Sequence, residues 1–373
     1  MDIQAALLRE PKAAFSIETV QLDAPRPDEV VVEIVACGLC HTDLSVRDGV
    51  IPFPALPNVL GHEGSGVVIA VGSAVSKVAV GDPVALSFAS CGACPACEAG
   101  TPARCDNFLP ANFMGRRADG SCTHHQHGQD INGCFFGQSS FASHALVRER
   151  HVVKVPHDVP LELLGPLGCG IQTGAGTILN HLKPQPGSSV VVFGAGAVGL
   201  SAVMAARIAG CTTIIAVDVH PARLALAREL GATHALHARE DDVLARIKDI
   251  TGAGADCAVE ATGVPEVVAQ SIRSVRRGGQ VALLGVGRMD APLPLVLGDL
   301  LSGAVIQSVV EGDSVPDSFI PQLIEFYRQG RFPFDRLIQF YDFAQINEAA
   351  HDAETGRAIK PVICMPGANR RRP

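Results

Sequence analysis

The sequence predicts an α/β protein that consists of a β-rich domain and a doubly wound parallel sheet. The chain has 373 residues, which exceeds one ordinary domain and favours two. In residues 1–165, short apolar runs are broken by Gly, Pro and Asp, as expected for β-strands joined by turns. From residue 171 on, apolar strands alternate with segments of helix length, which indicates parallel βαβ units.

The expected elements follow this division in chain order. The first part contains the strand-like runs VVVEIVAC, GSGVVIAVG and VALSF. In the second part, the strands VVVFG, TIIAVD, CAVEAT and QVALLGV alternate with helical segments such as PARLALAREL. After residue 306 the alternation fades, and the tail has a helical patch, FIPQLIEFYRQG, and a final strand, KPVICM. We therefore expect domain boundaries near residues 170 and 306.

Composition excludes several classes of protein. The hydrophobic content of 47% supports buried cores, and the net charge of -8 argues against a nucleic-acid surface. The first residues lack a basic segment followed by an apolar one, so no secretory signal is expected. Twelve cysteines without such a signal favour reduced thiols and metal ligands in the cytoplasm. No membrane partner is expected, because the apolar stretch 188–210 is interpreted as a strand, a turn and a helix.

A metal site is predicted by four cysteines in the run CGACPACEAGTPARC. They are Cys91, Cys94, Cys97 and Cys105. Four thiolates at this spacing can surround one tetrahedral Zn²⁺, and a structural site is one in which all four positions are filled. Such a site leaves no position for a substrate, so the chemistry of the protein must be sought elsewhere.

A dinucleotide site is predicted by Gly194, Gly196 and Gly199, which follow an apolar strand and open a helix. In such a motif the glycines allow a tight turn, approach of the pyrophosphate and close helix packing. Asp218 ends the next strand, where a carboxylate can bind the ribose hydroxyls and repel a 2′-phosphate; this favours NAD over NADP. Arg223 could line the adenosine end, although an exposed cation on a helix explains it equally well.

An open metal site is a second candidate, formed by Cys40, His62 and Cys169. Two thiolates and one imidazole are the ligands of one type of catalytic zinc, whose fourth position stays free. From spacing alone, a buried histidine with two buried thiols remains an alternative. The CxxCH motif at 37–41 also matches c-type haem attachment, but that chemistry needs export, and no export signal is evident.

Taken together, these motifs give a chain that resembles the zinc-dependent medium-chain alcohol dehydrogenases over nearly its whole length. The resemblance runs from CGLCHTD and GHEGSGVV through the cysteine run, GCGIQTGAG and GAGAVG to TGRAIKPVI. It implies a GroES-like catalytic domain, formed by residues 1–170 and 307–373, around a Rossmann NAD-binding domain at 171–306. It also implies two zinc ions per subunit, with NAD as hydride acceptor.

The resemblance further implies roles for individual residues. Cys40, His62 and Cys169 would bind the catalytic zinc, and the four cysteines the structural zinc. Asp43 and Glu63 would orient the ligands, and Thr42 would take the proton of the alcohol. The implied cofactor contacts are His41 and Lys360 at the pyrophosphate and Thr173 at the nicotinamide. One position departs from the pattern, because Ser45 stands where some members have the last histidine of the proton relay.

Two features favour a primary aromatic or allylic alcohol as substrate. The segment GCFFGQSSFASHAL at 133–146 resembles the aryl-alcohol branch of the family. Ser87 falls near the place where other branches have a bulky aromatic residue, so a ring could fit beside the zinc. Polyol and glutathione-linked formaldehyde dehydrogenases remain alternatives, because they share the same motifs. Zinc-free quinone reductases and an inactive NAD-binding sensor agree less well, since all the zinc ligands and Thr42 are present.

Two further expectations concern surfaces. The apolar stretch LPLVLGDLLSGAVIQSVV at 293–310 lies where family members pair, which implies a homo-oligomer, either a dimer or a tetramer. A sixth strand buried within its own sheet explains the same residues.

HHQH at 124–127 is interpreted as a solvated turn and not as a third metal site.

Overall fold

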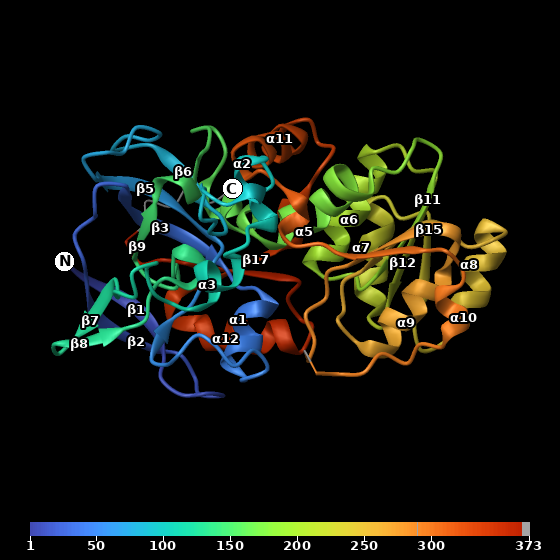
Figure 1. Cartoon of the computed structure of the whole chain (residues 1–373), viewed down its shortest axis with the longest axis horizontal. Coiled ribbons are helices and arrows are strands. Elements are labelled where there is room, and N and C mark those ends of the chain that lie inside the picture. Colours follow the sequence, from blue (N-terminus) through green and yellow to red (C-terminus); the bar gives the residue numbers. More distant parts are fainter. Residues whose placement is uncertain (289, 368–373) are drawn as a thin grey trace. The chain divides into compact units, whose positions relative to one another are not determined.

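The computed structural model describes residues 1–288 and 290–367. The chain forms two compact units. The first consists of Met1–Cys169, Val315–Gln322 and the chain from Asp335 onward, and the second of Gly170–Ser314 and Leu323–Phe334. Helix α11 (Pro316–Arg328) contributes to both units. Figure 1 labels the elements in chain order.

The first unit contains two sheets. One has the strand order β4-β1-β2-β7-β8. Its strands are β1 (Asp2–Leu8), β2 (Ser16–Leu22), β4 (Asn58–Val59), β7 (His124–Gln126) and β8 (Gln129–Ile131). The other has the order β10-β6-β5-β3-β18-β17, with β9 also paired to β3. Its strands are β3 (Glu29–Gly38), β5 (Gly64–Val71), β6 (Pro83–Leu86), β9 (His144–Arg148), β10 (Val152–Lys154), β17 (Ile338–Asp342) and β18 (Lys360–Cys364).

The C-terminal strand β18 pairs antiparallel with β3, with Ile363 opposite Cys37. Strands from the N-terminal and C-terminal parts of the chain therefore belong to one sheet. Short helices accompany the strands, although the sequence suggested only strands before residue 165. They are α1 (His41–Arg47), α2 (Pro95–Glu98), α3 (Phe108–Phe113), α4 (Leu161–Leu164) and, near the end of the chain, α12 (Ile346–Glu354).

Helix α1 begins directly after β3 because Asp43 caps it. The Asp43 carboxylate accepts the backbone N–H of Cys40, which satisfies one of the free donors at a helix N-terminus. A helix of seven residues shows too little apolar periodicity to be recognised in the sequence.

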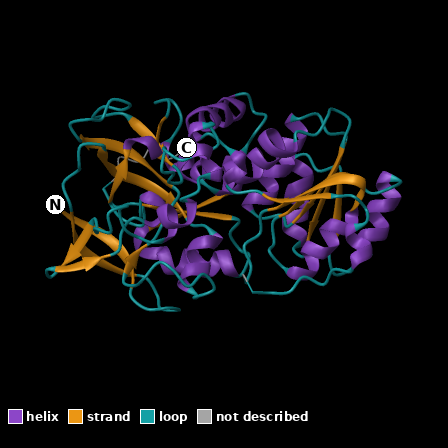
Figure 2. Cartoon of the chain, in the orientation of Figure 1, coloured by secondary structure: helices purple, strands orange, loops and turns teal. Residues whose placement is uncertain are grey.

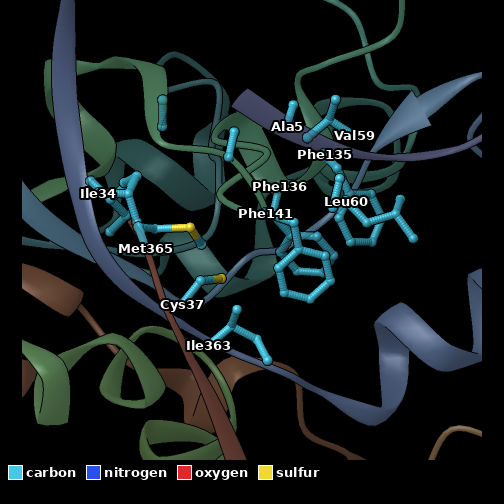
Figure 3. Packing of buried hydrophobic residues seen from close by; sticks show 14 of the residues in the cluster. Ala5, Ile34, Cys37, Val59, Leu60, Phe135, Phe136, Phe141, Ile363 and Met365 are labelled. Atoms are coloured by element: carbon cyan, nitrogen blue, oxygen red, sulfur yellow. The ribbon is translucent and has the colours of Figure 1, made fainter. Parts of the chain in front are cut away.

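The core of the first unit is rich in phenylalanine. Phe135, Phe136 and Phe141 gather beside Leu60, and Cys37 and Met365 belong to the same buried cluster (Figure 3). Phe135 and Phe141 are fully buried. This packing fixes the segments from which the candidate site residues come.

The second unit is a parallel sheet with the strand order β13-β12-β11-β14-β15-β16. Its strands are β11 (Ser189–Phe193), β12 (Thr213–Asp218), β13 (His234–His237), β14 (Ala255–Glu260), β15 (Val275–Leu283) and β16 (Val305–Ser308). Helices lie on both sides of this sheet (Figure 2). They are α5 (Gly170–Gly176), α6 (Ala197–Ile208), α7 (Pro221–Leu230), α8 (Val243–Thr251), α9 (Pro265–Ser274) and α10 (Leu297–Leu300). This is the 3-2-1-4-5-6 order of a Rossmann sheet.

The apolar stretch 188–210 forms strand β11 and helix α6, as expected. Within the residues that the structure describes, none of the helices has both the length and the apolar character needed to cross a membrane.

Candidate active site and metal centres

Three candidate ligands from distant parts of the first unit meet in the structure. Cys40 precedes α1, His62 lies just before β5, and Cys169 follows a short 3₁₀ turn at Gly165–Gly168. Their ligand atoms and one carboxylate oxygen of Glu63 all lie within 4.8 Å of one another. We call Cys40, His62 and Cys169 the three-ligand group.

The chemistry of this group fits a zinc ion. The Nδ1 atom of His62 lies 3.0 Å from an oxygen of Asp43, while its buried Nε2 atom has no hydrogen-bond partner and is available to a metal. The hydrogen bond from Cys169 lowers the pKa of Cys40 well below its usual range, against the opposite effect of burial. Two thiols and an imidazole oriented by a carboxylate are typical of catalytic zinc.

Asp43 joins two of the ligand segments. One of its oxygens accepts the backbone N–H of Gly61 at 3.0 Å, in addition to its contact with His62. The other oxygen accepts the backbone N–H of Cys40 at 3.0 Å. The carboxylate is completely buried, so these contacts are not weakened by water. Asp43 therefore fixes both the ring of His62 and the main chain on either side of the group.

Glu63 is paired with Lys360 in the interior. The Nζ atom of Lys360 lies 2.9 Å from both carboxylate oxygens and 3.3 Å from the carbonyl oxygen of Leu39. Burial alone would lower the pKa of Lys360, but the Glu63 carboxylate raises it above its usual range. An ammonium group has three donors. A contact with a pyrophosphate, as the resemblance implies, would therefore require Lys360 to give up one of these hydrogen bonds.

The remaining residues expected around the group lie on α1. Thr42 is partly exposed, and its Oγ1 atom lies 3.7 Å from the Sγ atom of Cys40. His41 is exposed, whereas Ser45 is buried. The hydroxyl of Thr42 thus lies beside the three-ligand group, and the imidazole of His41 is accessible to a ligand.

Aromatic rings surround His62. The Phe136 ring is stacked on the imidazole with 4.3 Å between centroids, and Phe135 meets it edge-on at 5.5 Å. Phe136 adopts a φ of +50°, in the left-handed region that is costly for a residue with a side chain. The sequence identified this segment only as a mark of the aryl-alcohol branch. The contact with His62 arises from tertiary packing and has no local sequence signal.

The four cysteines of the predicted structural site also come together. The Sγ atoms of Cys91, Cys94, Cys97 and Cys105 all lie within 4.8 Å of one another. The Cys91 and Cys97 sulfurs are 4.0 Å apart, and those of Cys94 and Cys105 are 3.9 Å apart. Four convergent thiols match the closed, four-ligand coordination of structural zinc. We call these residues the four-cysteine group.

The glycine motif of the second unit has the geometry of a dinucleotide site. Gly194 has a φ of +92°, and a Cβ atom on Gly199 would lie 1.7 Å from the carbonyl oxygen of Gly194. At Gly196, the N-cap of α6, an added Cβ would meet nothing within 4 Å. Packing therefore requires the outer glycines, whereas the space beside Gly196 is open to a ligand at the helix N-terminus.

Asp218 ends β12 and lies close to this turn. Its oxygens accept the backbone N–H groups of Ala195 at 2.6 Å and His220 at 2.8 Å. Each carboxylate oxygen can accept a further hydrogen bond, as a ribose would require. Arg223 is partly buried, and its Nε atom has no partner. Thr173 lies in α5, where its carbonyl oxygen accepts the hydroxyl of Thr177.

The interpretation of HHQH as a solvated turn is wrong for its first residues. His124 and His125 form part of strand β7, which pairs with β2, and His124 is completely buried because alternate side chains of a strand face the core. Burial lowers the pKa of His124 to about 4, so the ring is neutral. Among the described residues, these histidines belong to no group of three or more candidate metal ligands.

Comparisons with known proteins show the family of this chain. Residues 197–328 match the family model described as zinc-binding dehydrogenase, and residues 26–157 match the alcohol dehydrogenase GroES-like domain. A geraniol dehydrogenase from Castellaniella defragrans is 50% identical over 364 residues, which cover 96% of this chain and 97% of that protein.

Solved structures extend the similarity to the fold. An alcohol dehydrogenase zinc-binding domain protein from Burkholderia ambifaria is 53% identical, with a TM-score of 0.95, and covers 98% of this chain and 99% of that one. Benzyl alcohol dehydrogenase from Acinetobacter calcoaceticus is 47% identical, with a TM-score of 0.94 and the same coverage. The chain therefore belongs to the zinc-dependent medium-chain alcohol dehydrogenases, with a GroES-like domain and a Rossmann domain.

Proposed function

We propose that this enzyme oxidises a primary aromatic or allylic alcohol to its aldehyde and transfers the hydride to NAD. The observation that carries the proposal is the three-ligand group, in which the free Nε2 atom of His62 faces two thiols. The substrate class is supported by the similarity to a geraniol dehydrogenase and a benzyl alcohol dehydrogenase. The aromatic rings of Phe135 and Phe136 beside His62 agree with an apolar substrate.

In the proposed mechanism, each site residue of the first unit has its own task. When bound by Cys40, His62 and Cys169, zinc supplies Lewis acidity that lowers the pKa of the alcohol hydroxyl. Asp43 keeps the His62 ring in the orientation that directs Nε2 to the metal. Thr42 Oγ1 accepts the alcohol proton, which then passes to solvent or Ser45.

Binding of NAD is assigned to residues 171–306, which lie within the second unit and which we propose as the cofactor domain. Gly194, Gly196 and Gly199 leave the α6 N-terminus accessible to the pyrophosphate. The buried carboxylate of Asp218 favours a ribose hydroxyl over a 2′-phosphate by charge repulsion. We further propose His41, Thr173, Arg223 and Lys360 as cofactor contacts. NAD supplies the hydride acceptor, and the protein fixes its position.

A second, structural zinc is proposed for the four-cysteine group, which gives two zinc ions per chain. The catalytic domain would then comprise residues 1–170 and 307–373. None of the twelve cysteines, all of which lie in the described residues, forms a disulfide, which supports the proposal that the enzyme works in the reducing cytoplasm.

Activity with a panel of alcohols tests the proposed function. We expect NADH formation, followed at 340 nm, with at least about ten-fold higher kcat/KM for benzyl alcohol and geraniol than for ethanol. That factor corresponds to about 1.4 kcal/mol of additional transition-state binding. NAD should be preferred to NADP in the same assay. A higher kcat/KM with sorbitol or S-hydroxymethylglutathione would contradict the proposed substrate class.

We also propose a homodimer formed through the Rossmann sheet. Strand β16 is at the edge of this sheet, and several apolar side chains before and within it are exposed, among them Leu297 at 73% and Val305 at 51%. An unpaired apolar edge of this kind is typical of a surface that pairs with a second copy.

The double substitution Leu297→Lys and Val305→Lys should convert the dimer into a monomer in sedimentation velocity, because it places four charges in the paired surface. Val80→Lys, at an exposed apolar position of the first unit, is the control and should leave the dimer intact. A double variant that sediments like the unmodified protein would rule out this edge.

A further inference from the structure

Gln138 is a buried amide beside the three-ligand group, within segment 133–146, and the proposed mechanism gives it no role. Its side chain is completely buried and makes four hydrogen bonds. The amide oxygen accepts the backbone N–H of Gly64 at 3.0 Å and the hydroxyl of Ser140 at 2.8 Å. The amide nitrogen donates to the carbonyl oxygen of His62 at 3.0 Å and to that of Ser87 at 3.4 Å. The side chain therefore holds the main chain on both sides of Glu63.

Ser87 extends this hydrogen-bond network to the segment of a second candidate ligand, Cys169. Its hydroxyl donates to the carbonyl oxygen of Gly168 at 2.8 Å, and Gly168 precedes Cys169. A Cβ atom at Gly168 would lie 2.0 Å from the carbonyl oxygen of Leu86, so this peptide packs directly on the end of β6. The sequence suggested that Ser87 matters because it is small. Its buried hydroxyl gives it a second role, since an alanine would be smaller still but could not donate.

We propose that Gln138 and Ser87 form a brace that positions the His62 and Cys169 segments for metal binding. Both are positioning residues, because they contact the main chain at or beside the ligands and not the metal. The brace complements Asp43, whose hydrogen bonds join the segments of Cys40 and His62. This inference rests on the proposed catalytic zinc at the three-ligand group.

Burial makes the hydrogen bonds of the brace costly to lose. A zinc ligand must be held within a few tenths of an ångström, and residues that orient ligands typically contribute 10- to 100-fold to metal affinity or activity. Each brace hydrogen bond lies in the interior, where a lost donor leaves a carbonyl oxygen unsatisfied. Removal of either side chain should therefore loosen the three-ligand group and leave the four-cysteine group unchanged.

Metal release provides the test, because it is measured without turnover. The zinc-loaded enzyme, as unmodified protein and as Ser87→Ala, Gln138→Met and the double variant, is mixed with a chromophoric chelator, and the release of each zinc is timed. We expect the zinc of the three-ligand group to leave at least about ten-fold faster from each single variant. The double variant should show less than the product of the two effects, because both residues act through one connection. Cobalt in the three-ligand group should show shifted absorption bands in the variants.

Ser271→Ala is the matched control. It also removes a buried hydroxyl that donates to a backbone carbonyl, that of Val268, but it lies in helix α9 of the second unit. If zinc release were accelerated equally in Ser271→Ala, general destabilisation would explain the effect, and the proposed brace would be overturned. Release rates and cobalt spectra of the brace variants identical to those of the unmodified protein would also overturn it. A different result, namely that the unmodified protein binds no metal at the three-ligand group, would contradict the proposed function itself.

Discussion

The Cys40→Ala variant should lose alcohol oxidation by at least about 100-fold while it keeps its fold and one zinc ion. Residues that only orient the ligands of a catalytic metal already contribute 10- to 100-fold to affinity or activity, so the loss of a ligand itself should cost at least as much. Because Cys40 is partly exposed, its substitution removes little core packing and should not unfold the first unit. The zinc that remains should belong to the four-cysteine group, which shares no residue with the three-ligand group.

Metal content and initial rates with benzyl alcohol and NAD measure these two effects together. Cys37→Ala is the matched control, because this neighbouring cysteine is buried in the core and belongs to neither metal group. It should keep two zinc ions and most of its activity, although its stability will fall slightly because a small cavity is created. Full alcohol oxidation by Cys40→Ala would contradict the whole catalytic assignment.

The fold of the second unit could be predicted because its signals are local and strong. Central parallel strands are covered on both faces and are therefore apolar throughout, as in Val190–Phe193, and they alternate with amphipathic helices. In the first unit the strands were recognisable, but the pairing of β18 with β3 was not, since it joins residues more than 300 positions apart. The resemblance implied only that both ends of the chain form one domain, and not which strands pair.

The sequence predicted which candidate ligands come together, and the resemblance added Asp43 and Glu63, but the other contacts around the site could not be predicted. Cysteine and histidine at motif spacing are recognisable because few other chemistries require them. The stacking of Phe136 on His62, the Lys360–Glu63 pair and the hydrogen bonds of Gln138 all depend on contacts between distant segments. Phenylalanine, lysine and glutamine occur throughout the chain, so nothing in their local sequence marks these positions. The burial of His124 was missed for the same reason.

Loss of one cysteine of the four-cysteine group should destabilise the first unit much more than a surface substitution does. In Cys97→Ser we expect one zinc ion instead of two and a melting temperature lower by on the order of 10 °C. The physical reason is that segment 91–105 has too little buried surface of its own to stay ordered without the metal. Its helix α2 has four residues, none of them buried, so zinc binding must offset the entropy of ordering the segment. Cys97 itself is partly exposed, so the substitution removes little packing.

Limited trypsin digestion locates the effect more directly than the melting temperature. Arg104 is exposed within the segment, and ordering by zinc should protect the peptide bond that follows it. Mass spectrometry should therefore detect rapid cleavage after Arg104 in Cys97→Ser and slow cleavage in the unmodified protein. Cys211→Ser, a partly exposed cysteine of the second unit outside both metal groups, is the control and should resist cleavage. At low temperature, Cys97→Ser should still oxidise alcohol, because its three-ligand group is intact. Two zinc ions and unchanged proteolysis in this variant would show that the four cysteines do not hold a structural metal.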